Sequence, residues 1–185
     1  MFKKKREYLS VIERIKAKDL LFIDESGAHL QMVPRYGRAE GGERAIVTAP
    51  YQRGNQITMI SAISLEKVEA AMYGEWNANS EIFTHFIEKS LCPILRAGHV
   101  VVMDNVGFHK TEKVIELIES TGARCVYLPP YHPELNPIEE MWSKIKSILR
   151  KLSARSSQEF KKAIRQAFEA IENTDLLGWF QHAGY

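Results

Sequence analysis

The chain has 185 residues, a length typical of one domain that buries a core without disulfides. Its apolar content of 45% and charged content of 26% are those of an ordinary globular protein, and it has neither an apolar run of membrane-spanning length nor an apolar signal sequence, which argues against a membrane or secreted protein. The net charge of +2 is uneven, because residues 1–18 carry +5, residues 143–165 carry +7 and the remainder carries −10.

Basic flanks around an acidic centre suit a polyanion that is held beside a metal-binding pocket. Two solvated helix faces and a basic tail explain the same charges more simply. Charge alone is therefore weak evidence for a nucleic-acid partner. The two cysteines, Cys92 and Cys125, stand far apart, so we expect reduced thiols in a cytoplasmic protein.

The first part of the chain predicts a basic linker or helix over residues 1–18, followed by a strand. The apolar positions of this segment keep helical spacing. Residues 20–24 form an apolar run that ends in Asp24. Glycine and proline residues then mark a long loop that holds Arg35 and Arg38.

The next part predicts an antiparallel meander and a helix. Residues 45–49 and 56–64 have the composition of two strands around a turn, and residues 70–76 that of a third. Residues 80–91 place their apolar side chains on one helical face, with Ser80 as the expected N-cap.

The remainder alternates between strands and helices. Strands are predicted at 99–103 and 124–128, and helices at 112–120, 136–152 and 156–171. Ser156 and Glu159 have the spacing of a capping box. A meander followed by strand–helix units predicts an α/β fold with a mixed sheet flanked by helices. We expect this domain to cover residues 19–175, with residues 176–185 as a C-terminal tail.

Three carboxylates stand out from this pattern. Asp24 and Asp104 each follow an apolar strand, where burial of an acid is costly unless it is paired or bound to a cation. The two acids face each other if their strands are neighbours. Each acid alone could instead open a turn. Together with an acid at a helix start, they form the kind of divalent-metal site that phosphoryl transfer uses.

The residue pattern leaves two interpretations of the third acid open. Asn136, Pro137 and Glu139 form a variant of a capping box that needs no catalytic role. Glu139 and Glu140 lie on opposite edges of the apolar stripe of this helix, so periodicity does not choose between them.

Histidines and basic residues complete the candidate site. The six histidines show no zinc-binding spacing, and only His109, five residues after Asp104, is expected near the pocket. Basic residues follow Glu139 on the 136–152 helix. These residues are Lys144, Lys146, Arg150 and Lys151.

Three motifs together resemble a known family. They are Phe22-Ile23-Asp24-Glu25-Ser26-Gly27, Met103-Asp104-Asn105 with His109, and Leu128-Pro129-Pro130-Tyr131-His132-Pro133 running on to Asn136-Pro137-Ile138-Glu139. In this order they resemble the DDE transposases, and most closely the bacterial six-thirty insertion-sequence family of the mariner-like superfamily. The 34 residues between Asp104 and Glu139 match the spacing of the last two catalytic acids of that family, which selects Glu139 over Glu140.

The resemblance implies a ribonuclease H-like fold with a mixed five-stranded sheet. It implies that Asp24, Asp104 and Glu139 are catalytic and hold two Mg²⁺ (or Mn²⁺) ions. It also implies that the protein cuts double-stranded DNA at transposon ends and joins the freed end to target DNA at TA sites, as a homodimer. Lys144, Lys146, Arg150 and Lys151 are then expected along DNA phosphates beside Glu139, because they share its helix. Arg35, Arg38 and His109 are further expected DNA contacts.

The chain departs from this family at its start. Members of the family carry N-terminal helix-turn-helix domains, whereas this chain begins in what resembles the linker. We therefore expect either a fragment or a second reading frame joined to an upstream one. A remnant that binds DNA or the full-length transposase without cutting is the alternative function. A magnesium-binding receiver-like domain is a third interpretation, against which the opening meander counts.

Overall fold

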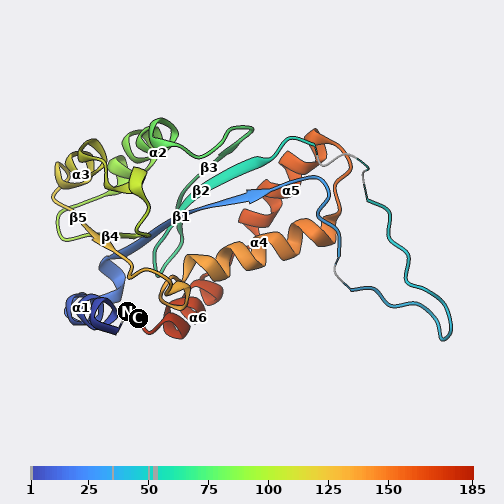
Figure 1. The fold of residues 1–185 in the computed structure, drawn as a ribbon, viewed down its shortest axis with the longest axis horizontal. Coiled ribbons are helices and arrows are strands. Elements are labelled where there is room, and N and C mark those ends of the chain that lie inside the picture. The colour runs from blue at the N-terminus through green and yellow to red at the C-terminus, as the bar shows by residue number, and fades with distance from the viewer. Residues whose placement is uncertain (1, 35, 50, 52–53) are drawn as a thin grey trace.

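The sheet of this protein is mixed and five-stranded, with the strand order β3-β2-β1-β4-β5 in the computed structural model, which describes residues 2–34, 36–49, 51 and 54–185 (Figure 1). The strands are β1 (Leu20–Ala28), β2 (Ile57–Ile63), β3 (Val68–Gly74), β4 (Val100–Met103) and β5 (Arg124–Tyr127). β1 pairs antiparallel with β2 and parallel with β4. The expected meander followed by parallel strands is therefore confirmed.

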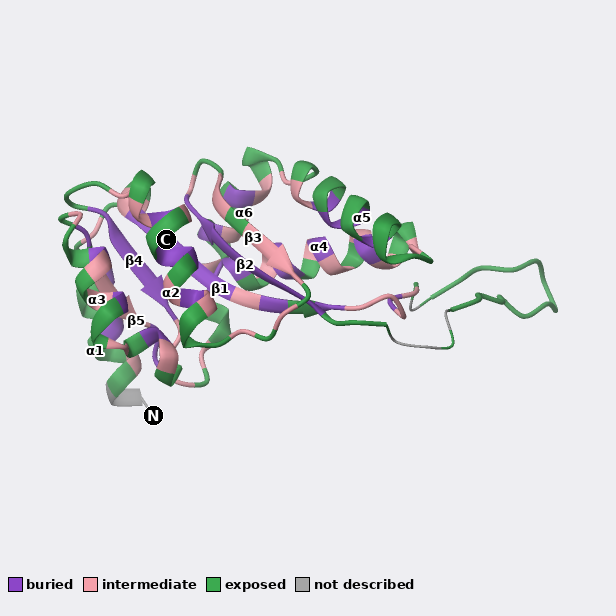
Figure 2. Cartoon of the chain, turned by 90° about the horizontal axis from the view of Figure 1, so that it is seen from above, coloured by how far each residue is buried: buried purple, intermediate pink, exposed green. Residues whose placement is uncertain are grey.

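Helices cover both faces of this sheet. They are α1 (Phe2–Ile12), α2 (Ser80–Phe86), α3 (Glu112–Glu119), α4 (Ile138–Leu152), α5 (Ser157–Glu169) and α6 (Asn173–Ala183). Alternate residues of β1 point to opposite faces. Phe22 belongs to the core formed with α1, α4, α5 and α6, while Ile23 belongs to the core formed with α2 and α3. Figure 2 shows most of β1, β2 and β4 in the colour of buried residues.

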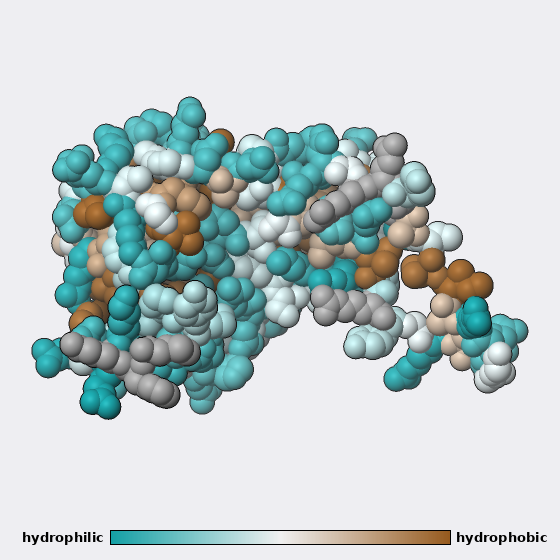
Figure 3. Space-filling view, in the orientation of Figure 1, coloured by the Kyte–Doolittle hydropathy of each residue, from teal (hydrophilic) through white to brown (hydrophobic). Residues whose placement is uncertain are grey.

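A long arm, residues 29–56, joins β1 to β2 and projects from the body (Figure 1). The strand expected at 45–49 is not formed, although its residues favour strands. A strand needs a neighbour for its hydrogen bonds, and this segment is exposed, with Ile46 88% accessible. Apolar atoms are accordingly visible on the arm in Figure 3.

The helix expected at 80–91 is two elements. Asn79, and not Ser80, caps α2 by accepting a hydrogen bond from the backbone of Ile82. The chain then continues as one π-helical turn over Ile87–Leu91. The capping box of Ser156 and Glu159 is formed as expected.

The expected C-terminal tail is instead part of the folded body. Residues 176–183 belong to α6, and Phe180 is fully buried against Phe22, with ring centroids 5.3 Å apart. Gly178 and the short length of this segment give it a weak helical propensity. Tertiary packing of Leu176 and Phe180 outweighs that weak propensity.

Replacing Phe180 with Ala should lower the free energy of unfolding by about 3–5 kcal/mol, as is typical for a buried aromatic residue. Urea unfolding followed by circular dichroism would measure the change. Leu177→Ala on the same helix is the matched control, because Leu177 is 45% exposed. Its effect should stay within about 1 kcal/mol. Equal effects of the two substitutions would contradict the packing described for α6.

None of the helices in the described residues is long and apolar enough to cross a membrane.

Candidate active site

Asp24 and Asp104 come together because β1 and β4 are parallel neighbours. Ile23 pairs with Met103 in the register of these strands, so the next residue of each chain segment is an aspartate. The two strands are neighbours, as the expected facing pair of aspartates requires. Asp24 does not end its strand, however, since β1 continues to Ala28 through its pairing with β2.

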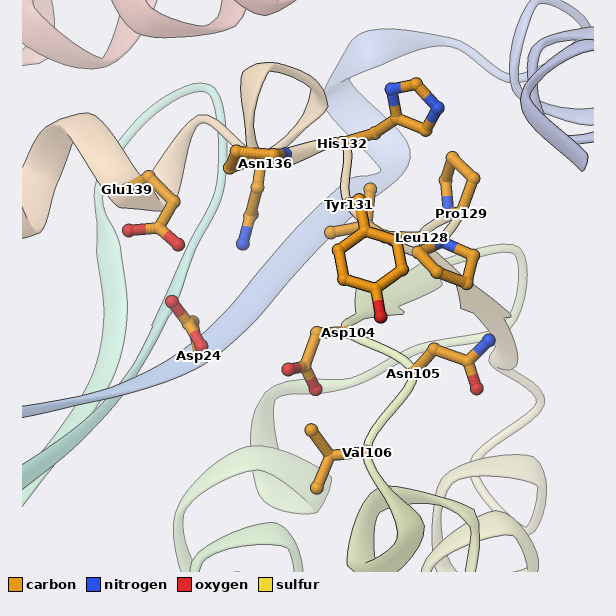
Figure 4. A pocket seen from close by; sticks show the side chains of 12 residues that line it. Asp24, Asp104, Asn105, Val106, Leu128, Pro129, Tyr131, His132, Asn136 and Glu139 are labelled. Atoms are coloured by element: carbon orange, nitrogen blue, oxygen red, sulfur yellow. The ribbon is translucent and has the colours of Figure 1, made fainter. Parts of the chain in front are cut away.

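Glu139 joins the two aspartates from the first turn of α4. All three carboxylates line one cleft of about 450 Å³, and Figure 4 shows them turned toward it. Glu140 lies outside this lining and pairs with His182 of α6. The fold therefore separates the two glutamates that helical periodicity left equivalent.

The capping interpretation of Asn136 and Glu139 is wrong. Pro137 occupies the N-cap position of α4, and no side-chain capping bond is made there. The backbone of Glu139 donates to the carbonyl of Asn136 at 3.1 Å instead. The exposed side chain of Glu139 thus belongs to the cleft.

The environment of Asp24 opposes its ionisation. Asp24 is only 9% exposed. Burial, followed by the negative charge of Glu139, raises the pKa of Asp24 to about 8, and Glu25 and Asp104 add to the effect. The indole Nε1 of Trp142, three residues after Glu139 on α4, donates a hydrogen bond to Asp24 Oδ2 at 3.2 Å.

His109 holds Asp104 from the opposite side of the sheet. The Nδ1 of its buried ring forms an ion pair with Asp104 Oδ1 at 2.5 Å, and its Nε2 lies 2.8 Å from Glu25 Oε1. Burial lowers the pKa of His109, but its bonds to the two carboxylates outweigh that effect and raise the pKa to about 9. The ion pair with His109 therefore orients Asp104.

The structure does not support His109 as a DNA contact, because its side chain is fully buried. The ring packs on Phe83, with centroids 4.1 Å apart. Glu25, its other partner, is a residue that sequence reasoning missed. The available signal was the alternation along β1, which sends Glu25 to the face opposite that of Asp24.

The donor set of the cleft suits a hard divalent cation. Carboxylate oxygens are the ligands that Mg²⁺ and Mn²⁺ prefer, and a cation would relieve the repulsion that raises the pKa of Asp24. Within the described part of the chain, no three His, Cys, Asp or Glu side chains already converge on one ion position. Asp24, Asp104 and Glu139 are the residues that could hold metal, because they line this cleft together.

The expected DNA-contacting residues occupy several places. Lys144 pairs with Asp175 of α6, and Lys146 is half-buried on α4. Arg150 and Lys151 line a separate hollow of about 340 Å³ beside the arm. Arg38 is exposed on the arm itself, and Arg35 lies outside the described residues. Lys144, Lys146, Arg150 and Lys151 do not line the acidic cleft itself, so their contact with DNA phosphates stays a prediction.

Comparison with known proteins gives a family and a fold. The model of the DDE superfamily endonuclease family matches residues 19–161. The structure is similar to a pre-cleavage Mos1 transpososome at a TM-score of 0.78 and 15% identity, over 97% of this chain and 57% of that one. A Mos1 mariner paired-end complex with Mn gives 0.76 at 17% identity, over 97% of this chain and 56% of that one.

The isolated catalytic domain of Mos1 mariner transposase is also similar, at a TM-score of 0.69 and 12% identity, over 97% of this chain and 84% of that one. The fold is therefore the ribonuclease H-like fold of that catalytic domain. The chain spans a little over half the length of the transposase chains in the transpososome structures. No curated protein matches it in sequence.

Proposed function

The chain belongs to the DDE superfamily endonuclease family, and from this premise we propose that it is a DDE transposase of the mariner-like type, which cuts DNA at transposon ends and joins the freed ends to target DNA. The observation that carries the proposal is the cleft that Asp24, Asp104 and Glu139 line together. Two strands and one helix of a single domain deliver these acids to the same place.

We assign the metal sites to these three residues. Two bound Mg²⁺ or Mn²⁺ ions would supply Lewis acidity for the attack on a phosphodiester and for its leaving oxygen. His109 holds the carboxylate of Asp104 in place, and Trp142 does the same for Asp24. Because these partners fix the side chains in advance, the acids lose little freedom when a cation and a phosphate enter.

The finer features are proposals of the same kind. They include insertion at TA sites, a homodimer as the working unit, and action in the bacterial cytoplasm as a six-thirty insertion-sequence member. The titles of the similar structures describe transposon-end complexes of Mos1. A helix-turn-helix segment, whether in a longer form of this chain or from an upstream frame, would supply end recognition. The domain boundaries at residues 19 and 175 are also a proposal. The C-terminal boundary moves beyond residue 175, because helix α6 packs against the domain.

Metal removal tests the proposed activity directly. The chain should convert supercoiled plasmid DNA to nicked circles with Mg²⁺ or Mn²⁺ and should stop when EDTA is added. Agarose gels with time points measure the rate. Binding of DNA without nicking, together with no calorimetric signal for Mn²⁺, would instead support the alternative of a non-cutting remnant.

A further inference from the structure

The acidic cleft has two unlike sides. The three carboxylates form one side, and the other is mainly apolar. The apolar side consists of Val106, Leu128, Pro129, Pro130, Tyr131 and Pro133, and the polar residues Asn105, His132 and Asn136 complete the lining of the cleft. A phosphodiester seated at the carboxylates would therefore have one of its flanking nucleotides against an apolar surface. The charge of the acids accounts for the first side only.

Tyr131 is the aromatic residue of this apolar side. Its side chain is 87% exposed, and it stands in the cleft in Figure 4. Its backbone has a φ of 62°, in the left-handed region that a bulky residue rarely adopts. Glycine or asparagine would suit this turn better. Folding therefore does not explain a tyrosine here, and none of the ring contacts among the described residues involves it.

Three polar contacts fix the loop that carries Tyr131. His132 Nδ1 lies 2.8 Å from Glu134 Oε1, which also pairs with Lys5 of α1 at 3.0 Å. The hydroxyl of Tyr185 donates to the carbonyl of Leu135 at 2.7 Å. A ring on a braced loop loses little conformational freedom when it meets a ligand, so it is suited to binding.

We propose that Tyr131 is a stacking platform for an unstacked nucleobase next to the scissile phosphodiester. This inference rests on the proposed function and adds a substrate-positioning residue to it. Every base has a flat face that stacks on an aromatic ring, whereas bases within a duplex are covered by their neighbours. The partner is thus a base at a strand end or one turned out of the helix. Its phosphate lies at the carboxylates, and its ring lies on Tyr131.

A binding cycle tests the stacking. The probe is a DNA duplex with a short single-stranded end that carries 2-aminopurine, compared with the same DNA carrying an abasic site at that position. Binding is measured with Mn²⁺ in the Glu139→Gln background, in which the DNA stays uncut. Tyr131→Asn removes the ring and tolerates the left-handed backbone. Tyr131→Trp keeps a stacking surface, and Tyr51→Asn is the matched control, since Tyr51 is 99% exposed on the arm.

Tyr131→Asn should weaken binding of the 2-aminopurine DNA by about 5- to 100-fold, the range of base–aromatic stacking, and should remove the fluorescence quenching. Tyr131→Trp should restore both, and Tyr51→Asn should change neither. On abasic DNA the Tyr131→Asn and parent proteins should bind equally.

Equal losses on both DNAs, or unchanged quenching in Tyr131→Asn, would overturn the stacking. Nicking of plasmid DNA by the unmodified chain distinguishes a failure of the stacking proposal from a failure of the proposed function. If that chain cuts plasmid DNA while Tyr131→Asn binds both probes like its parent, only the stacking is wrong. If the chain does not cut, the proposed function fails and the stacking proposal falls with it.

Discussion

Asp24→Asn should abolish metal-dependent DNA cleavage and, in the same protein, raise the melting temperature without metal. The amide still accepts the hydrogen bond of Trp142 Nε1, so the packing around residue 24 is kept. The substitution removes the carboxylate charge that is buried beside Glu139 and Asp104. A loss of activity with a gain of stability distinguishes a functional carboxylate from a structural one.

The stability gain should depend on pH. The pKa of Asp24 is about 8 in the folded chain, against an ordinary value of 3.8. Between these values the folded state holds a proton that the unfolded state has lost, so the wild type loses stability as pH rises through this window. Asn does not titrate. The advantage of Asp24→Asn should therefore be small near about pH 4 and largest above about pH 8.

Differential scanning fluorimetry in EDTA measures this difference. Above about pH 8 the variant should melt more than about 4 °C higher than the wild type, since each kcal/mol shifts the melting temperature of a domain this size by about 2–4 °C. Added Mn²⁺ should raise the melting temperature of the wild type but not that of the variant. A variant that melts lower than the wild type in EDTA would contradict the crowding of carboxylates described here.

Glu139→Gln should lower the cleavage rate by more than about 100-fold, because even residues that merely support a metal ligand cost 10–100-fold. Glu140→Gln, its immediate neighbour, should cleave at close to the wild-type rate. Glu140 lies outside the cleft and pairs with His182 at the surface. The two substitutions are chemically identical, and the residues adjoin on the same helix turn.

Plasmid nicking with Mn²⁺ compares the two variants, and thermal melting checks that both are folded. Exposed ion pairs contribute about 0–1 kcal/mol, so the loss of the pair with His182 should change stability little. Equal activity of Glu139→Gln and Glu140→Gln would remove Glu139 from the site.

Local signals predicted the central part of the fold. The apolar runs before Asp24 and Asp104 became neighbouring strands, and the capping box at Ser156 formed as expected. The predictions for two segments were wrong for the same reason. Residues 45–49 found no neighbouring strand, and the last residues gained a helix through contact with Phe22. Both outcomes are decided by tertiary contacts, which local composition does not contain.

The site was predictable to a similar extent. Strand ends and motif spacing indicated the three carboxylates, but periodicity did not separate Glu139 from Glu140. Their separation comes from the direction in which α4 leaves the loop. The link of His109 to Glu25 spans 84 positions of the chain, and a contact of that range depends on the pairing of β1 with β4.

The arm between β1 and β2 has a consequence for how this protein can be divided. It separates the segment that contributes Asp24 from the segment that contributes Asp104 and Glu139, yet β1 is paired on both sides within the sheet. A protease cut in the exposed arm would thus leave two fragments joined by backbone hydrogen bonds. If the two fragments are expressed separately, the cleft should be complete only when the shorter one inserts β1 between β2 and β4 of the longer one.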